Sequence, residues 1–276
     1  MYNKWNDVKG KIHSQSPLIH CITSPIAIND CANAVLALGA KPIMAEHPLE
    51  VENITLMSKS LAVSLANITD ARAESIMISG KAACKAGIPS VIDLVGVTCS
   101  KMRADFAKKY ITQCRPAVIK GNVSEIKAVC GMGFDASSGI DVSDKDKVDS
   151  ANPKSIEEMS YIVKNYAAAN GWVVMASGET DIISDGKEVY HISNGSSRMA
   201  DVTGTGCILN CITAVFMSVT DALTACVLAA AVLGISGELA DDSRGLGTYH
   251  IGLIDSLSLM DSEKFSQMAK IKKYNK

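Results

Sequence analysis

The chain has 276 residues, of which 47% are hydrophobic and 20% charged, and its formal net charge is −2. This length suits one large domain, so we expect a single domain over residues 1–276. A charge so close to neutral argues against binding to nucleic acid or to an anionic membrane. The lysines of 270–273 are an exception, and we expect them to form a frayed, solvated terminus.

The first two thirds of the chain alternate short apolar runs with helix-like segments. Each apolar run is brief, rich in β-branched residues and followed by a polar or glycine-bearing turn, which is typical of buried parallel strands. We expect strands at 61–65, 90–93, 117–119 and 172–175, and helices at 30–38, 71–86, 124–130 and 155–170. The alternation predicts an α/β fold, a mostly parallel central sheet with helices on both faces.

The last third has a different pattern. Asp185-Gly186 stands between two β-rich runs within 181–193, which predicts an antiparallel hairpin. From 206 to about 240 the chain is almost wholly helical in character. Its apolar run at 222–237 is shorter than the roughly 20 residues of a membrane span, so a buried helix explains it better. The polar segment 139–153 is expected to be an exposed connection within the one domain.

The cysteines indicate a reducing compartment. Their odd number, their scatter and the absence of a Cys-x-x-Cys pair argue against a disulfide framework or a zinc site. The charged N-terminus has no secretory signal pattern, so we expect reduced thiols in a cytoplasmic protein. Most of the nine are expected to be small core residues, at positions 21, 31, 84, 99, 114, 130, 207, 211 and 226.

The most informative motif is the glycine-rich turn Asp-Val-Thr-Gly-Thr-Gly-Cys at 201–207, directly before a long apolar run. Such a turn opening a helix points several backbone N–H groups, and the positive end of the helix dipole, at one spot. This predicts an anion site for a phosphate. Cys207 falls on the first helical turn, where the pKa of a thiol tends to fall and a thiolate could act as a base. The structural alternative, a small residue packing a helix start, is equally compatible with the motif.

Polar residues also follow three of the predicted strands. Asp93 ends the 90–93 strand and could reach a metal or simply cap a turn. Lys120 follows the next strand and suits phosphate oxygens. Glu125 suits Mg²⁺, usually through water, although Asn122-x-x-Glu125 is also a capping-box variant without catalytic meaning. Ser177 follows the 172–175 strand as a small hydroxyl placed for a nucleotide phosphate.

Because ligands of parallel sheets bind beyond the carboxyl ends of the strands, these residues and the glycine-rich turn should converge. Together they predict magnesium-assisted phosphoryl transfer. The chain has neither a Walker A sequence, nor a Gly-x-Gly-x-x-Gly at a first βα unit, nor a Gly-x-Ser-x-Gly elbow. A P-loop NTPase, a dinucleotide dehydrogenase and a serine hydrolase are therefore disfavoured.

The motifs resemble those of the hydroxyethylthiazole kinase family over roughly residues 17–240, and in the family's order. They are His20-Cys21-Ile22-Thr23, Asn29, Ala32-Asn33, Leu36-Ala37-Leu38-Gly39-Ala40, Pro42-Ile43-Met44-Ala45, Asp93-x-Val95-Gly96, Lys120-Gly121-Asn122-x-x-Glu125-Ile126, Ser177-Gly178-Glu179-x-Asp181 and Val202-Thr203-Gly204-x-Gly206-Cys207. The ending on Cys207 is specific, because wider ribokinase-like kinases typically have Asp there. The chain departs from the family at Ser24 (commonly Asn), Asp30 (often aromatic), Leu94 (often Pro), Lys120 (usually Arg) and Ser177 (usually Thr).

The resemblance implies a ribokinase-like fold without a separate lid domain. It implies ATP- and Mg²⁺-dependent phosphorylation of 4-methyl-5-(2-hydroxyethyl)thiazole, a step of thiamine salvage, by a homotrimer with thiazole sites between subunits. The implied roles are Met44 and Gly204 for the thiazole, Lys120 and Ser177 for ATP, Asp93 and Glu125 for Mg²⁺, and Cys207 as candidate base.

Two alternatives stay open at this point. One is a related kinase acting on another primary alcohol, such as hydroxymethylpyrimidine or pyridoxal, against which the 20–45 segment and Cys207 speak. The other is a binding protein that kept the fold and lost turnover. Retention of Asp93, Glu125 and Cys207 together argues against that loss, since decay should strike metal and base positions first.

Overall fold

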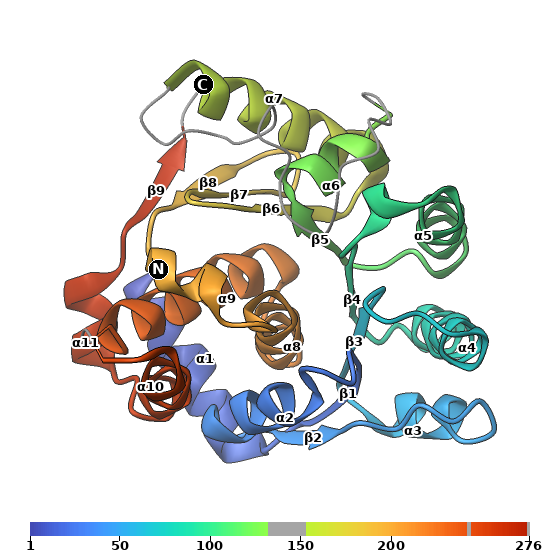
Figure 1. The fold of residues 1–276 in the computed structure, drawn as a ribbon, viewed down its shortest axis with the longest axis horizontal. Coiled ribbons are helices and arrows are strands. Elements are labelled where there is room, and N and C mark those ends of the chain that lie inside the picture. The colour runs from blue at the N-terminus through green and yellow to red at the C-terminus, as the bar shows by residue number, and fades with distance from the viewer. Residues whose placement is uncertain (132–152, 242–243, 275–276) are drawn as a thin grey trace.

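The computed structural model describes residues 1–131, 153–241 and 244–274. Its centre is a nine-stranded sheet in the order β2-β1-β3-β4-β5-β6-β7-β8-β9, with helices on both faces (Figure 1). Five adjacent strand pairs, from β2·β1 to β5·β6, are parallel, and the last three pairs are antiparallel. The mostly parallel α/β sheet expected from the sequence is therefore confirmed.

The four strands expected in the first part of the chain all form. They are β3 (Ser60–Ser64), β4 (Ser90–Asp93), β5 (Val118–Asn122) and β6 (Val173–Ser177). The hairpin also forms, as β7 (Asp181–Ser184) and β8 (Val189–Ile192). Gly186 has φ +87° in its turn, a left-handed conformation that a side chain would disfavour. The segment 139–152 of the expected connection lies outside the described residues, and α7 begins at Pro153.

Two further strands precede those found by pattern. β1 (Leu18–Ile22) and β2 (Lys41–Ile43) enclose the expected helix α2 (Ile28–Ala37). β1 pairs with β2 on one side and with β3 on the other. The strand order therefore reverses at β1, because β2 is added on one side of it and the later strands on the other. Such a switch point opens a crevice at the carboxyl ends of the flanking strands, which is where α/β proteins bind ligands.

One face of the sheet is covered by the apolar helices of the last third. The helical stretch from 206 to 240 is two helices, α8 (Thr205–Met217) and α9 (Ala222–Leu239), with Asp221 capping the second through Thr224 N–H. The same face carries α1 (Tyr2–Gln15), α2, α10 (Leu246–Ser258) and α11 (Ser262–Met268). Helix α9 has the length and composition of a membrane span, but 78% of it is buried inside the fold. It is therefore a core helix, as expected.

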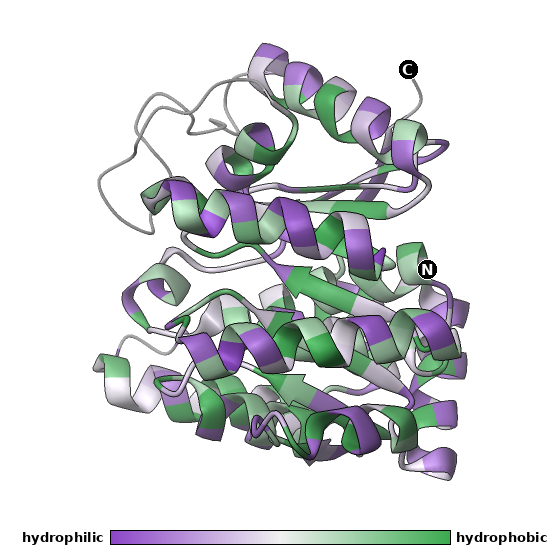
Figure 2. Cartoon of the chain, turned by 90° about the vertical axis from the view of Figure 1, so that its right-hand side faces the viewer, coloured by the Kyte–Doolittle hydropathy of each residue, from purple (hydrophilic) through white to green (hydrophobic). Residues whose placement is uncertain are grey.

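The opposite face carries α3 (Val51–Met57), α4 (Asp70–Ala86), α5 (Lys101–Cys114), α6 (Val123–Val129) and α7 (Pro153–Asn170). Figure 2, which views the molecule from the side of α3 to α5, shows hydrophilic and hydrophobic residues alternating along these helices. This is the pattern of amphipathic helices with one side on a sheet. Two apolar cores result, one on each side of the sheet.

The C-terminus corrects one expectation. Residues 271–274 are not frayed but form β9 (Ile271–Tyr274), which pairs antiparallel with β8 and completes the sheet. The strand has partly buried ends and exposed lysines between them, at Lys272 and Lys273. An edge strand rich in lysine is a common protection against pairing with another molecule, so the charge that suggested a loose tail is compatible with a strand.

Candidate active site

The glycine-rich turn at 201–207 leads directly into α8 (Thr205–Met217), as the sequence predicts. Gly204 precedes α8 with φ +91°, and a Cβ placed on it would lie 2.8 Å from the Cβ of Ala27. Both the left-handed backbone and this close approach require glycine here. As the N-cap residue, Gly204 has no side chain to bond to the first turn of α8. The first turn of α8 thus has no side-chain cap from its N-cap residue, which is compatible with the predicted anion site.

Lys120 and Asp93 form a buried ion pair beside this helix start. They stand opposite each other on β5 and β4, and Lys120 Nζ lies 3.0 Å from Asp93 Oδ1. The side chains are 4% and 3% exposed. A Cβ on Gly206 would lie 3.6 Å from Lys120 Nζ, so the ammonium faces the glycine-rich turn. Burial acts to lower the pKa of Lys120, but Asp93 outweighs it and the pKa is raised, which keeps the ammonium charged.

Glu125 belongs to the same cluster and is also a helix cap. Its Oε2 accepts from Asn122 N at 2.7 Å while Asn122 Oδ1 accepts from Glu125 N, so the capping box is present. Its Oε1 accepts from Gly96 N at 2.8 Å. Gly121 makes room for it, because a Cβ there would lie 3.1 Å from Glu125 Oε2. Burial, and then the charge of Asp93, raise the pKa of Glu125 to about 7.

This donor set fits a magnesium ion. Two carboxylates that repel each other face one region, and a divalent cation would relieve the repulsion that raises the pKa of Glu125. Mg²⁺ in proteins is commonly held by one or two carboxylates, with water and phosphate oxygens completing the shell. No cluster of three or more metal-binding side chains occurs among the described residues.

Cys207 lies in the first turn of α8 and is 7% exposed. A hydrogen bond with Thr23 of the segment after β1 holds its thiol. Burial, and then the charge of Asp93, raise the pKa of Cys207 to about 11. The lowered pKa expected at a helix start is therefore wrong for the protein without ligands, because desolvation and a neighbouring carboxylate outweigh the helix dipole.

Cys207 lies near two further thiols, those of Cys31 and Cys211. Cys31 and Cys211 are hydrogen-bonded to each other, and Cys211 also to Cys21, so β1, α2 and α8 meet through sulfur atoms. All nine cysteines are free, and six of them are buried, as expected for reduced core residues.

Ser177 ends β6 opposite Asn122 of β5, and its hydroxyl donates to Gly121 O at 3.2 Å. The loop after it is shaped by Asp181, whose Oδ1 accepts from Gly178 N at 3.0 Å. Burial raises the pKa of Asp181 to about 7, although the charge of Lys120 acts against this. Ser177 and Lys120 thus lie on adjacent strands at the edge where the glycine-rich turn lies.

The remaining predicted site residue, Met44, lies at the other side of the switch point. It directly follows β2, is half-buried and packs against the core on the side of α8. Ser24 donates from its hydroxyl to Asn67 Oδ1 at 2.7 Å, which joins the segments after β1 and β3. Asp30 lies between helices, with Oδ1 3.0 Å from Nε2 of His250 on α10.

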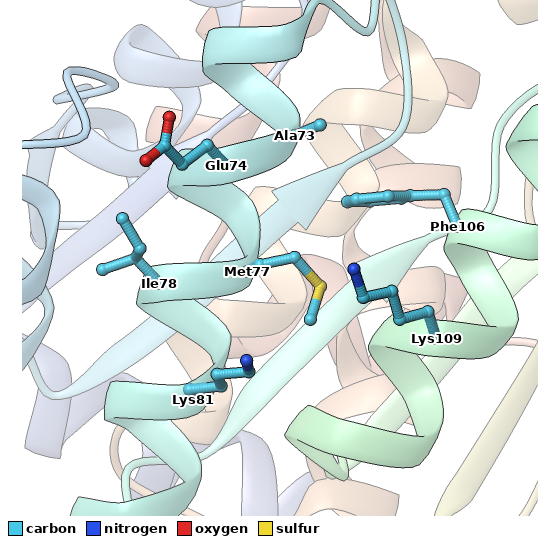
Figure 3. A pocket seen from close by; sticks show the side chains of 7 residues that line it. All are labelled: Ala73, Glu74, Met77, Ile78, Lys81, Phe106 and Lys109. Atoms are coloured by element: carbon cyan, nitrogen blue, oxygen red, sulfur yellow. The ribbon is translucent and has the colours of Figure 1, made fainter.

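Pattern analysis missed several residues of this edge. Thr23 was part of a motif but had no role assigned, and it bonds to both Cys31 and Cys207. Arg72 in the first turn of α4 and Glu46 after β2 form an ion pair of 2.9 Å. The available signal was position, since the start of the helix after a parallel strand lies at the ligand-binding edge. A groove of about 430 Å³ between α4 and α5 has none of the predicted site residues in its lining (Figure 3).

The fold and this arrangement of groups define a kinase of the ribokinase-like class. Among solved structures, a ribokinase-like superfamily protein from Enterococcus faecalis has a TM-score of 0.58 at 12% identity, covering 90% of this chain and 88% of that one. At that identity the likeness concerns the fold alone.

The family follows from closer relatives. The Hydroxyethylthiazole kinase family matches residues 10–263, and the chain belongs to it. A curated relative named hydroxyethylthiazole kinase 2, from Clostridium botulinum strain Hall, is 48% identical over 97% of this chain and 99% of its own length. The structure of a hydroxyethylthiazole kinase protein from Pyrococcus horikoshii has a TM-score of 0.88 at 27% identity, with all of both chains covered.

Proposed function

We propose that this enzyme transfers the terminal phosphoryl group of ATP to the hydroxyl of 4-methyl-5-(2-hydroxyethyl)thiazole, a step of thiamine salvage. The observation that carries the proposal is the meeting of Lys120, Asp93 and Gly206 at one point of the sheet edge. Membership of the family supplies the substrate class.

Lys120 and the amides that begin α8 hold the phosphoryl group and offset its charge, which is the main catalytic contribution in phosphoryl transfer. Ser177 contacts the nucleotide from the end of β6. Gly204 and Met44 line the thiazole site on the switch-point side. A substrate between them has its hydroxyl beside Cys207, and both substrates stand at the carboxyl edge of the parallel strands.

Asp93 and, through water, Glu125 hold Mg²⁺ in this proposal. A Mg²⁺ ion held there would supply positive charge that offsets the negative charge developing on the phosphate. Asp93 then has two roles, since it also keeps Lys120 charged and oriented. Glu125 reaches the same region only because Gly121 has no side chain.

Cys207 is the candidate base for the hydroxyl proton. Because burial raises its pKa to about 11, the group is a thiol at neutral pH and accepts that proton only after it has lost its own. Transfer through a loose transition state needs the proton removed late, so a base contributes less than the charge-stabilising groups.

The family resemblance further supports a homotrimer in the cytoplasm, with thiazole sites between subunits. Exposed apolar side chains on α2, α3 and α10, and in the turns that precede α2 and α3, support an interface, at Ile26, Leu36, Leu49, Met57 and Ile251. Light scattering should give three times the chain mass of 29.2 kDa. A fully active monomer would refute shared sites.

The direct test is ADP release by the purified enzyme with ATP, Mg²⁺ and one alcohol at a time. Hydroxyethylthiazole should give ADP and a thiazole phosphate in equal amounts. Robust turnover of hydroxymethylpyrimidine or pyridoxal, with none of the thiazole, would instead assign the enzyme to a related kinase. No ADP with any of the three alcohols, together with tight thiazole binding, would indicate a binding protein.

A further inference from the structure

Arg72 is buried but only partly satisfied. Its side chain is 5% exposed, and Nη1 donates to Glu46 Oε2 at 2.9 Å. Nε and Nη2 are also buried, and neither finds an acceptor within residues 1–131, 153–241 and 244–274. Nearly all buried donors of native proteins are hydrogen-bonded, and a charged group left unpaired is especially unfavourable. Two unpaired donor atoms on one guanidinium therefore point to an acceptor that the described part of the chain does not supply.

The position of Arg72 links these donors to the reaction. Helix α4 follows β3, whose carboxyl end flanks the switch point. Ser75, one turn along α4, donates to Glu46 O at 2.7 Å, which fixes the segment after β2 that also carries Met44. Arg72 is close enough to Cys207 for the two groups to interact electrostatically. The guanidinium thus lies beside the segment that carries the proposed ring contact and within electrostatic reach of the proposed base.

The geometry and charge of the pair indicate the kind of acceptor. Nε–H and Nη2–H leave the planar guanidinium on the same side, while Nη1 is engaged by Glu46. Glu46 already neutralises the charge of Arg72, and Asp93 adds negative potential at Cys207. A ligand carboxylate at this place would be repelled by the negative charges of Glu46 and Asp93. The free edge of the guanidinium therefore suits a neutral acceptor better than an anion.

We propose that Arg72 is a specificity-determining residue that donates a hydrogen bond to the ring nitrogen of a hydroxyalkyl azole. The inference rests on the proposed function, in which the hydroxyl lies beside Cys207 and the ring beside Met44. In that orientation the ring nitrogen is the one strong acceptor of the thiazole ring, because its sulfur accepts weakly. Arg72 thereby distinguishes azole alcohols from alcohols on rings without this nitrogen.

The test compares hydroxyethylthiazole with the thiophene alcohol in which the ring nitrogen is replaced by CH. The parent enzyme should prefer the thiazole in kcat/KM by roughly 10- to 100-fold, the range for a hydrogen bond to a charged group. Arg72→Met should lower kcat/KM for the thiazole by that factor, mainly through KM, and leave the thiophene almost unchanged. The preference should disappear.

Two further variants separate binding from folding. Arg72→Lys keeps a cation beside Glu46 but loses the planar pair of donors, so it should restore stability and not the preference. Lys81→Met removes an exposed cation from the same helix and should behave like the parent. Glu46 is 45% exposed, so it stays solvated when Arg72 is removed and the variants should fold.

Three results would overturn the proposal. If Arg72→Met lowers kcat/KM equally for both alcohols, Arg72 only supports the fold. If the preference for the thiazole over the thiophene is unchanged in Arg72→Met, Arg72 takes no part in substrate recognition. The third result concerns a thiazole that carries a carboxylate on the carbon between nitrogen and sulfur. If the enzyme prefers this compound only when Arg72 is present, the free edge of Arg72 binds an anion and not a neutral acceptor. Absence of thiazole turnover by the parent would refute the proposed function instead. Calorimetric binding of the two alcohols, which needs no turnover, would still test Arg72.

Discussion

Replacing Gly206 by alanine separates the two properties of the glycine-rich turn. Gly206 lies within α8 and its φ is not left-handed, so alanine fits the backbone there. The nearest atom to the added Cβ is Lys120 Nζ at 3.6 Å, an ordinary contact. Replacing a helical glycine by alanine is favourable by about 0.5–1 kcal/mol. We therefore expect Gly206→Ala to fold normally and to be slightly more stable.

Its activity should fall sharply nonetheless. The methyl group occupies the space between the turn and the ammonium of Lys120, which is where a phosphoryl group would be held. Loss of one well-placed donor to a developing negative charge typically lowers kcat by roughly 10²- to 10³-fold. The same loss is expected here, with ATP affinity reduced as well.

Thermal unfolding and ADP release with hydroxyethylthiazole measure the two effects. Gly10→Ala is the matched control, because nothing lies within 4 Å of its Cβ on α1, so it should gain similar stability and keep full activity. Gly204→Ala should instead lose about 2–5 kcal/mol of stability, from its positive φ and its 2.8 Å approach to Ala27. A Gly206→Ala enzyme within threefold of the parent would refute a backbone anion site at this turn.

Substitutions at three other positions test individual groups. Cys207→Ala should lower kcat by roughly 10²-fold, and Cys207→Asp should lower it by much less. If both variants have the same kcat as the parent, Cys207 has only a packing role. Glu125→Gln keeps a capping-box residue but should raise the Mg²⁺ concentration needed for activity, so unchanged activity at limiting Mg²⁺ would make Glu125 a cap alone. Asp181 has its pKa raised to about 7, so the stability it lends is complete below pH 4 and is lost as the pH rises to 7. Asp181→Asn should therefore match the parent near pH 4 and exceed its stability at pH 8 by up to about 4 kcal/mol in urea titrations, and a difference independent of pH would contradict the reasoning.

Local signals determined much of the fold and part of the site. The strand at 90–93 forms with the expected bounds, because its apolar and β-branched residues are buried on both sides of a parallel sheet. The capping box of Asn122 and Glu125 and the glycine turn before α8 depend on neighbours within a few residues, so their patterns are readable in sequence. The resemblance to hydroxyethylthiazole kinases, confirmed by family membership, was carried by these same short motifs.

Features that depend on distant partners were not readable. β9 forms because it pairs with β8, with Ile271 opposite Ile192. The lysine-rich sequence of β9 does not indicate which strand it pairs with. β1 and β2 are strands through pairing with β3 and with each other, despite the polar His20 and the short length of 41–43. Pairing across long separations in sequence is decided by the whole fold and not by local preference.

The sequence by itself determined which groups make up the proposed site: two carboxylates, a lysine, a cysteine and a glycine-opened helix. The tertiary structure alone decided their electrostatic states. Packing α8 over β3 and β4 buries Cys207 near Asp93, which raises the pKa that a helix start would otherwise lower. Burial of Arg72 on α4 likewise leaves two of its donor atoms without an acceptor among the residues that the structure describes. Ionisation and hydrogen bonding depend on solvent exclusion and on nearby charges, and these come from segments far apart in the chain.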